Sequence, residues 1–204
     1  EANPRASRTL PFVSKSTGYP LARLAVRAML GEKLTDLPEL IEMEGVSVKV
    51  PTFSWLKITG LDTVLGPEMK STGEAMGHGP TFGTAYLKAM KGGNKTIPTS
   101  GTVFLSVSNK LKIEFSEVAK ELINLGFKLI ATKGTAAHLR KNGINSKVIW
   151  RISDRKQPDI LSVMRNKRVD LIVNLPTGRR AATDGAQMRR LAVELGIPFI
   201  TTMT

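Results

Sequence analysis

Short apolar runs alternate with amphipathic segments from about residue 102 to the end of the chain. The apolar runs predict strands at residues 103–107, 127–131, 147–150, 169–174 and 197–201. The segments between them predict helices at residues 113–125, 135–141, 158–165 and 184–195. Because short buried strands that alternate with helices are typical of open parallel sheets, this half is predicted to be a doubly wound five-stranded parallel sheet, an α/β fold.

The first half of the chain has a less regular pattern. A helical periodicity runs over residues 20–30 and ends at Gly31. A short strand is predicted at 46–50, then a long loop, then a helix at 81–90. This order of elements predicts a small α+β segment in front of the parallel sheet.

Residues 91–101 read Lys-Gly-Gly-Asn-Lys-Thr-Ile-Pro-Thr-Ser-Gly and are rich in turn formers. Such a composition favours a connection between two units over a helix or strand. We therefore expect a first unit at residues 1–91, a linker at 92–101 and a second domain at 102–204.

Positive charge is concentrated in the second half. The whole chain has a formal net charge of +13; residues 1–96 contain 12 Lys and Arg against 9 Asp and Glu, and residues 97–204 contain 18 against 8. Such a field suits nucleic acid, acidic surfaces or small phosphorylated ligands. Aromatic residues make up only 5% of the chain and do not alternate with basic ones, which disfavours a nucleic-acid platform. A free-standing anion-binding or nucleic-acid-binding module stays open as an alternative.

The absence of cysteine excludes disulfides and thiolate metal sites and fits a reducing compartment. No apolar stretch approaches the roughly 20 residues that a membrane span needs. The first residues lack the basic-then-apolar layout of a secretory signal. We therefore expect a cytoplasmic protein with no membrane partner.

The predicted strands end in polar residues. These ends are residues 131–135, 150–151, 174–180 and 201–202, and they contribute hydroxyls, an amide and cations. Because open α/β sheets bind ligands at the carboxyl ends of their strands, these groups are expected to converge on one edge. Gly134 and Thr135 also open a predicted helix, whose free N–H groups favour an anion. The pattern predicts a phosphate- or carboxylate-binding site.

The first residues contain a second candidate site. Glu1 and Asn3 stand two positions apart, so on an extended strand their oxygens point to one face and could share one Mg²⁺. Arg5 follows with a planar fork suited to phosphate or bicarbonate oxygens.

Two stretches resemble signatures of the carbamoyl phosphate synthetase large subunit. Residues 1–22 are similar to the last metal-binding strand of an ATP-grasp domain, and residues 65–77 (Leu-Gly-Pro-Glu-Met-Lys-Ser-Thr-Gly-Glu-Ala-Met-Gly) are similar to a later signature of the same subunit. The resemblance covers essentially the whole chain, as the tail of a much longer subunit. It implies that residues 1–91 are a partial ATP-grasp α+β segment whose nucleotide-clamping strands lie upstream of Glu1. We therefore expect the isolated chain to lack carbamoyl phosphate synthesis and ATPase activity.

The second half resembles the methylglyoxal synthase-like domain that ends this subunit and binds effectors such as UMP and IMP. The resemblance places these residues around the effector: Lys112, Thr132, Thr135, Arg151, Asn174, Thr177, Arg179 and Arg180. Arg151 stands where the family often has Lys, and Pro176 where a hydroxyl residue is common. Trp150 leaves open an N-acetylglutamate-type effector domain, as in urea-cycle enzymes, or simple packing of its ring.

The resemblance further implies that the parent makes carbamoyl phosphate from bicarbonate, glutamine-derived ammonia and ATP, for pyrimidine and arginine synthesis. Its cofactors would be Mg²⁺ and ATP, held in part by Glu1, Asn3 and Arg5. Its partners would be the rest of the large subunit and a glutaminase small subunit. Glu74 and Thr201 are candidates for a second effector, ornithine, whose effect is expected to be weak or absent because Phe199 replaces a ligand-contacting Tyr.

Methylglyoxal synthase itself is the rival enzyme on this fold. Its chemistry needs a carboxylate base, and Gln157 stands at the position where the family has Asp. Asp159 lies nearby but at a predicted helix start, where capping is the expected role. Catalysis by this domain is therefore not expected.

Overall fold

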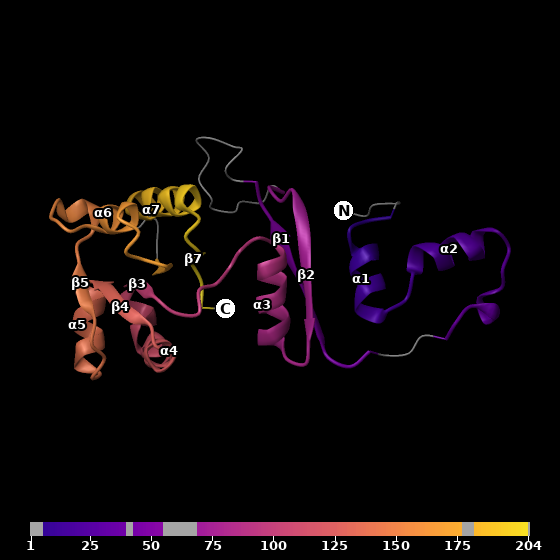
Figure 1. Cartoon of the computed structure of the whole chain (residues 1–204), viewed down its shortest axis with the longest axis horizontal. Coiled ribbons are helices and arrows are strands. Elements are labelled where there is room, and N and C mark those ends of the chain that lie inside the picture. Colours follow the sequence, from indigo (N-terminus) through magenta and orange to yellow (C-terminus); the bar gives the residue numbers. More distant parts are fainter. Residues whose placement is uncertain (1–5, 40–42, 55–68, 177–181, 204) are drawn as a thin grey trace. The chain divides into compact units, whose positions relative to one another are not determined.

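The computed structural model describes residues 6–39, 43–54, 69–176 and 182–203 (Figure 1). Its described residues divide into two compact units, and the chain passes from one to the other between Thr96 and Ile97. This point lies within the segment predicted as a linker, residues 92–101. No described helix is both long and apolar enough to cross a membrane.

The second unit contains a five-stranded sheet in which every pair of neighbours is parallel. Its order across the sheet is β5-β4-β3-β6-β7. The strands are β3 (Thr102–Val107), β4 (Lys128–Thr132), β5 (Lys147–Ile149), β6 (Leu171–Leu175) and β7 (Phe199–Ile200). The predicted parallel sheet is confirmed, and the strand ends differ from the predicted ones by at most two residues.

Helices cover both faces of this sheet. They are α4 (Lys112–Asn124), α5 (Lys133–Lys141), α6 (Ile160–Arg165) and α7 (Ala182–Leu195), with short 3-10 turns η3 (Asn109–Leu111) and η4 (Ile152–Asp154). Figure 1 shows α4 and α5 on one side of the strands and α6 and α7 on the other. Because side chains alternate along a strand, Val103 and Leu105 pack under α4 and α5, and Phe104 between them packs under α6 and α7. The fold is therefore doubly wound.

Local chemistry fixes the helix ends in this unit. Helix α4 ends at Asn124 with Leu125 as its C-cap, and Gly126 follows with a φ of +87°, a conformation that suits glycine. Asp159 caps α6 by accepting a hydrogen bond from the backbone N–H of Ser162 at 2.8 Å. The predicted capping role of Asp159 is thereby confirmed.

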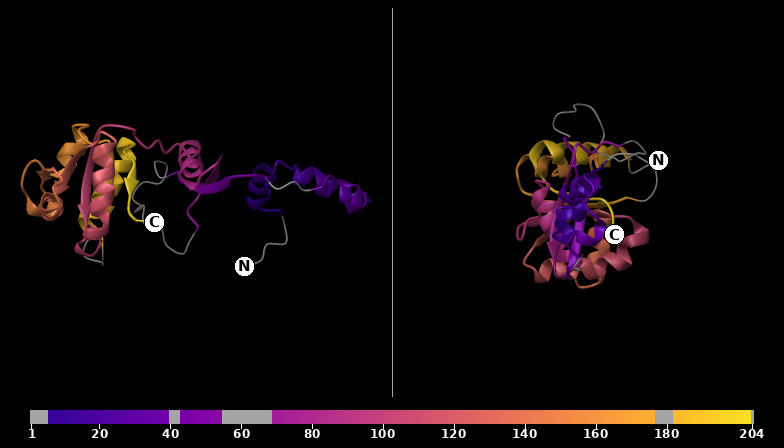
Figure 2. Two further views of the ribbon diagram at one scale, coloured as in Figure 1. Left: turned by 90° about the horizontal axis from the view of Figure 1, so that it is seen from below. Right: turned by 90° about the vertical axis from the view of Figure 1, so that its right-hand side faces the viewer.

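The first unit contains three helices and a two-stranded antiparallel sheet among its described residues. Its elements are α1 (Thr9–Thr17), α2 (Leu21–Met29), the 3-10 turn η1 (Leu34–Asp36), β1 (Val46–Thr52), β2 (Gly73–Gly79) and α3 (Phe82–Gly92). Figure 2 shows α1 and α2 following one another along the chain. Helix α3 begins after Thr81, whose hydroxyl accepts from the N–H of Thr84, and it packs on both strands.

Two elements of the first unit were not predicted. The sequence predicts a long loop where the structure has β2, because Gly73–Gly79 has glycine at three positions and no β-branched residue. Helix α1 is not predicted from the sequence. Its proline, Pro11, is compatible with a helix because it lies in the first turn, where the backbone N–H has no partner within the helix. Predicted helices α2 and α3 and predicted strand β1 are present.

Candidate functional site

A cavity of about 270 Å³ opens at the carboxyl ends of β3 and β6. These two strands are neighbours, but the chain leaves β3 toward the face of α4 and leaves β6 toward the face of α7. The site is thus the point at which the winding of the sheet reverses, where ligands of such folds bind. Its lining comprises Phe104, Ser106, Val107, Ser108, Thr132, Arg151, Ile152, Ser153, Ile160, Asn174, Leu175, Pro176, Asp184, Gly185 and Met188.

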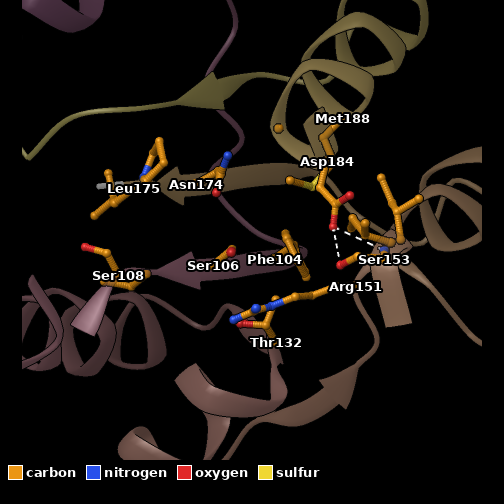
Figure 3. Close-up of a pocket in the computed structure, with 15 residues that line it drawn as sticks. Phe104, Ser106, Ser108, Thr132, Arg151, Ser153, Asn174, Leu175, Asp184 and Met188 are labelled. Atoms are coloured by element: carbon orange, nitrogen blue, oxygen red, sulfur yellow. Dashed lines mark hydrogen bonds between the residues drawn. The ribbon is translucent and has the colours of Figure 1, made fainter. Parts of the chain in front are cut away.

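Three of the residues predicted to bind an effector line this cavity: Thr132, Arg151 and Asn174. Thr132 ends β4 and Asn174 lies in β6, and both are buried. Arg151 precedes η4 and extends its guanidinium toward Thr132 (Figure 3). The sheet therefore brings a hydroxyl, an amide and a cation from separate strand ends to one place.

Lys112, the first residue of α4, lies beside this cavity in a shallower depression that also includes Gly134 and His138. Its ammonium group donates to Asn109 Oδ1 and to the Gly134 carbonyl oxygen, each at 2.8 Å. Burial lowers the pKa of Lys112 below its ordinary value, and the positive charge of Arg151 lowers it further.

Arg151 and Lys112 are therefore two cations close enough to repel each other. Within the part of the chain that the structure describes, neither has a carboxylate within ion-pair distance. An anion placed between them would relieve the repulsion and stabilise both charged forms. The electrostatics of the site favour a negatively charged ligand.

Thr135 is placed differently from the prediction. It is fully buried in α5, accepts a hydrogen bond from the Val107 N–H at 3.1 Å, and lies 3.1 Å from the Thr132 hydroxyl. Helix α5 begins at Lys133, two residues before Thr135. The hydroxyl of Thr135 thus ties β3 to α5, and its contact with an effector stays a prediction.

Glu74 and Thr201 do not line the cavity. Glu74 lies in β2 of the first unit and pairs with Lys49 at 3.4 Å. Thr201 is exposed just after β7. A second effector site at these two residues stays a prediction.

The remaining predicted residues lie outside the described ones: Glu1, Asn3, Arg5, Thr177, Arg179 and Arg180. Among the residues that are described, no group of three or more His, Cys, Asp or Glu side chains could hold a metal ion. The predicted Mg²⁺ site thus stays a prediction.

The cavity also contains polar residues that the sequence did not single out. Ser106 and Ser108 lie at the end of β3, and the buried hydroxyl of Ser108 has no hydrogen-bond partner in the described structure. Asp184, in the first turn of α7, accepts from the hydroxyl of Ser153 at 2.8 Å and from its N–H at 3.2 Å (Figure 3). The position of the two serines at the end of a predicted strand is the sequence signal that could identify them. For Asp184 the sequence indicates only the start of a helix.

Trp150 and Gln157 do not line the cavity. The ammonium group of Lys156 lies 4.7 Å from the centre of the Trp150 ring, and the backbone N–H of Trp150 donates to the Pro158 carbonyl oxygen. The Gln157 side-chain oxygen accepts from the N–H of Asp159, which itself caps α6. The structure thus shows these residues in local packing and turn contacts.

Comparison with known proteins gives one family and a set of long relatives. A family model described as MGS-like domain matches residues 114–201. The chain is 47% identical, over its full length, to the carbamoyl phosphate synthase large chain, C-terminal section, of Methanocaldococcus jannaschii. It is 48% identical to the carbamoyl phosphate synthase large chain of Archaeoglobus fulgidus and 44% to the C-terminal section from Methanopyrus kandleri, again over its full length.

The chain spans only part of these relatives: 35% of the first, 19% of the second and 39% of the third. Among solved structures, a methylglyoxal synthase from Elizabethkingia anophelis NUHP1 matches with 16% identity and a TM-score of 0.44. That match covers 52% of this chain and 74% of the other.

Proposed function

Because the chain belongs to the carbamoyl phosphate synthase large chain family and matches its members over its full length, we propose that it is the C-terminal regulatory section of such a subunit. Its second unit binds a small anionic effector in the cavity at the ends of β3 and β6. Its first unit is the remnant of an ATP-grasp domain.

The observation that carries this proposal is the electrostatic character of the cavity. Arg151 lines the cavity beside the hydroxyl of Thr132 and the amide of Asn174, and its charge acts on Lys112 in the neighbouring depression. Neither cation has a carboxylate partner among the described residues. Charge-assisted hydrogen bonds to a phosphate or carboxylate are the interactions that such groups make best. An anionic ligand is the one that this set of donors supports.

The size of the cavity favours a small ligand. Its volume of about 270 Å³ is slightly below the roughly 300–1,000 Å³ that is typical of small-molecule sites. The cavity therefore favours a ligand no larger than a mononucleotide such as UMP or IMP, with its phosphate toward Arg151 and Lys112. The rest of the nucleotide would lie toward Asp184 and Met188 at the other end of the lining.

The activity of the parent enzyme is part of the same proposal. The parent makes carbamoyl phosphate from bicarbonate, glutamine-derived ammonia and ATP, with a glutaminase small subunit as partner. Glu1 and Asn3 would hold Mg²⁺ there, and Arg5 would hold a phosphate or bicarbonate oxygen. These steps need the rest of the large chain, because one metal strand cannot align ATP with its acceptor.

Calorimetric titration of the chain with UMP, IMP, N-acetylglutamate and inorganic phosphate tests the proposal. We expect one site for UMP or IMP. Arg151→Ala should weaken it roughly tenfold or more, since a hydrogen bond to a charged group contributes about 1.5–3 kcal/mol. Lys128→Ala is the matched control, because Lys128 is an exposed cation at the opposite end of β4.

Other outcomes would contradict the assignment. Heat from N-acetylglutamate alone would place the chain with the N-acetylglutamate-type domains. Equal losses from Arg151→Ala and Lys128→Ala would mean diffuse attraction by net charge, as expected of a general anion-binding or nucleic-acid-binding module.

A further inference from the structure

The first turn of α7 holds two walls of the cavity together. One carboxylate oxygen of Asp184 accepts hydrogen bonds from both the hydroxyl and the backbone N–H of Ser153, which lies in η4 directly beside it (Figure 3). The next residue, Gly185, is packed closely against Asn174 and Arg189, so a side chain at this position would contact both. A Cβ there would lie 3.0 Å from Arg189 Nη1 and 3.3 Å from Asn174 Nδ2.

Ser153 is two residues from Arg151 in the sequence. The hydrogen bonds of Ser153 to Asp184 therefore affect the direction of the Arg151 side chain. The short turn that presents Arg151 is fixed at one point by Asp154, which accepts from the Arg151 N–H at 3.1 Å. It is fixed at a second point by Asp184, from a different element of the fold. Arg151 itself is exposed, and a long exposed side chain loses considerable rotamer freedom when it is ordered on a ligand.

We propose that Asp184 is a positioning residue of this site: through Ser153 it holds the turn that directs Arg151 into the cavity, and it thereby raises affinity for a phosphate group that lies at Arg151 and that Asp184 itself does not contact. The inference rests on the proposed function, since it assumes that the cavity binds an anion. In this proposal the Asp184 carboxylate favours anion binding by holding the turn, although its negative charge disfavours it. A carboxylate lining an anion site repels the ligand, whereas a held turn reduces the entropy that Arg151 loses on binding.

These opposed effects make the mechanism testable with inorganic phosphate, which is too small to span the cavity, alongside UMP. Asp184→Ala removes the acceptor, Asp184→Asn removes the charge but keeps an acceptor oxygen, and Ser153→Ala removes one of the two donors. Glu194→Gln is the matched control, because Glu194 is an exposed acid in the last turn of the same helix.

We expect Asp184→Ala and Ser153→Ala to weaken phosphate binding about three- to tenfold, the range of one hydrogen bond. Asp184→Asn should lose less, and Glu194→Gln nothing. In an Arg151→Ala background neither Ser153→Ala nor Asp184→Ala should weaken binding further, because the group that they position is gone. A simple loss of folding is checked by near-ultraviolet circular dichroism of each variant.

Two results would overturn the inference. Tighter phosphate binding by Asp184→Ala would mean that Asp184 acts only through its repulsive charge. Weaker UMP binding by Asp184→Ala, with phosphate binding and Ser153→Ala unaffected, would mean that Asp184 contacts the nucleotide directly.

If the proposed function itself is wrong, the unmodified chain should bind none of phosphate, UMP and IMP, a result distinct from the two above. The positioning of Arg151 is still measurable in that case by nuclear magnetic resonance relaxation at its side-chain Nε. We expect faster motion there in Ser153→Ala than in the unmodified chain or Glu194→Gln. Equal motion in all three would reject the role of Asp184.

Discussion

Lys112 is held by neutral partners in the structure, since its ammonium donates to a carbonyl and to an amide oxygen. Burial and the charge of Arg151 both favour its uncharged form and lower its pKa. A bound phosphate would act in the opposite direction and raise that pKa. Effector binding is therefore expected to be linked to proton uptake at this one lysine.

This linkage predicts the pH dependence of binding. Affinity for phosphate or UMP should fall as pH rises through the lowered pKa of Lys112, which lies below 10.5, because the free protein must then take up a proton in order to bind. Calorimetry at neutral and alkaline pH, in buffers of different ionisation enthalpy, measures both the loss of affinity and the proton uptake. Lys112→Met should bind more weakly and lose the pH dependence in this range. Retention of the full pH dependence in Lys112→Met would assign it to another group.

The same lysine affects folding with a defined sign. Its pKa is lower in the folded than in the unfolded chain, so the folded state binds fewer protons in the interval between these two values. The contribution of Lys112 to the free energy of unfolding therefore rises with pH across that interval.

The sequence predicts which residues line the cavity where their place at the end of a strand is sufficient to bring them there. Thr132, Arg151 and Asn174 follow or end strands, so the alternation of elements was enough to bring them together. Thr135 was not predictable in this way, because a hydroxyl near a helix start can bind a ligand or a neighbouring strand, and here it bonds Val107. The contact of Ser153 with Asp184 joins distant segments and has no local signal.

At the scale of elements, helix α3 approaches β2 so closely that only glycine fits between them. A Cβ on Gly77 would lie 2.0 Å from the Ala85 carbonyl oxygen and 2.4 Å from the Ala89 nitrogen. Both are backbone atoms of α3, so neither can rotate away. A Cβ on Gly79 would likewise lie 2.9 Å from the Thr84 side chain of α3. The packing of α3 thus explains two of the glycines that make β2 unlike a typical strand sequence.

Gly77→Ala should therefore destabilise the first unit by roughly 1–3 kcal/mol, the usual consequence of overpacking. Gly83→Ala is the matched control: Gly83 lies in α3, and a Cβ there would meet nothing within 4 Å. It should stabilise the helix by up to about 1 kcal/mol. Urea unfolding of both variants measures the difference, and equal stabilities would contradict the close packing.

The elements of the second unit were predicted well because burial on both sheet faces requires continuous apolar strands such as Val103 to Leu105. Their ends were less accurate, since β4 continues to Thr132 and α5 begins at once at Lys133. In the first unit, β2 depends on pairing with β1 along its whole length, from Gly73 opposite Thr52 to Gly79 opposite Val46. Tertiary contact, not local propensity, makes it a strand.

At the scale of the whole molecule, the chain passes between its two compact units at residues 96–97. Helix α3 ends at Gly92, and the N–H of Lys95 still bonds back to the Met90 carbonyl oxygen. From Thr96 to Gly101 the residues are exposed or half-buried and belong to no helix or strand. Within the linker that we propose at residues 92–101, the backbone is therefore most accessible from residue 96 to residue 101.

Trypsin should accordingly cut after Lys95 before it cuts after Lys91, which lies within α3. The product beginning near residue 96 should keep the parallel sheet and unfold cooperatively. Mass spectrometry of the digest and denaturant unfolding of the purified fragment check both points. A single protected fragment containing both units, with no cleavage between residues 91 and 101, would mean that they do not separate at this segment.

The walls of the cavity come from separate elements: Thr132 from β4, Arg151 from the connection after β5, Asn174 from β6 and Asp184 from α7. No local stretch of chain contains the site, so an unfolded or half-folded chain has no affinity for the ligand. By mass action a ligand at a hundred times its dissociation constant then stabilises the folded form by about 2.7 kcal/mol. A ligand bound in this cavity would also slow any degradation that begins from the unfolded chain, so that the ligand concentration would govern the lifetime of the polypeptide.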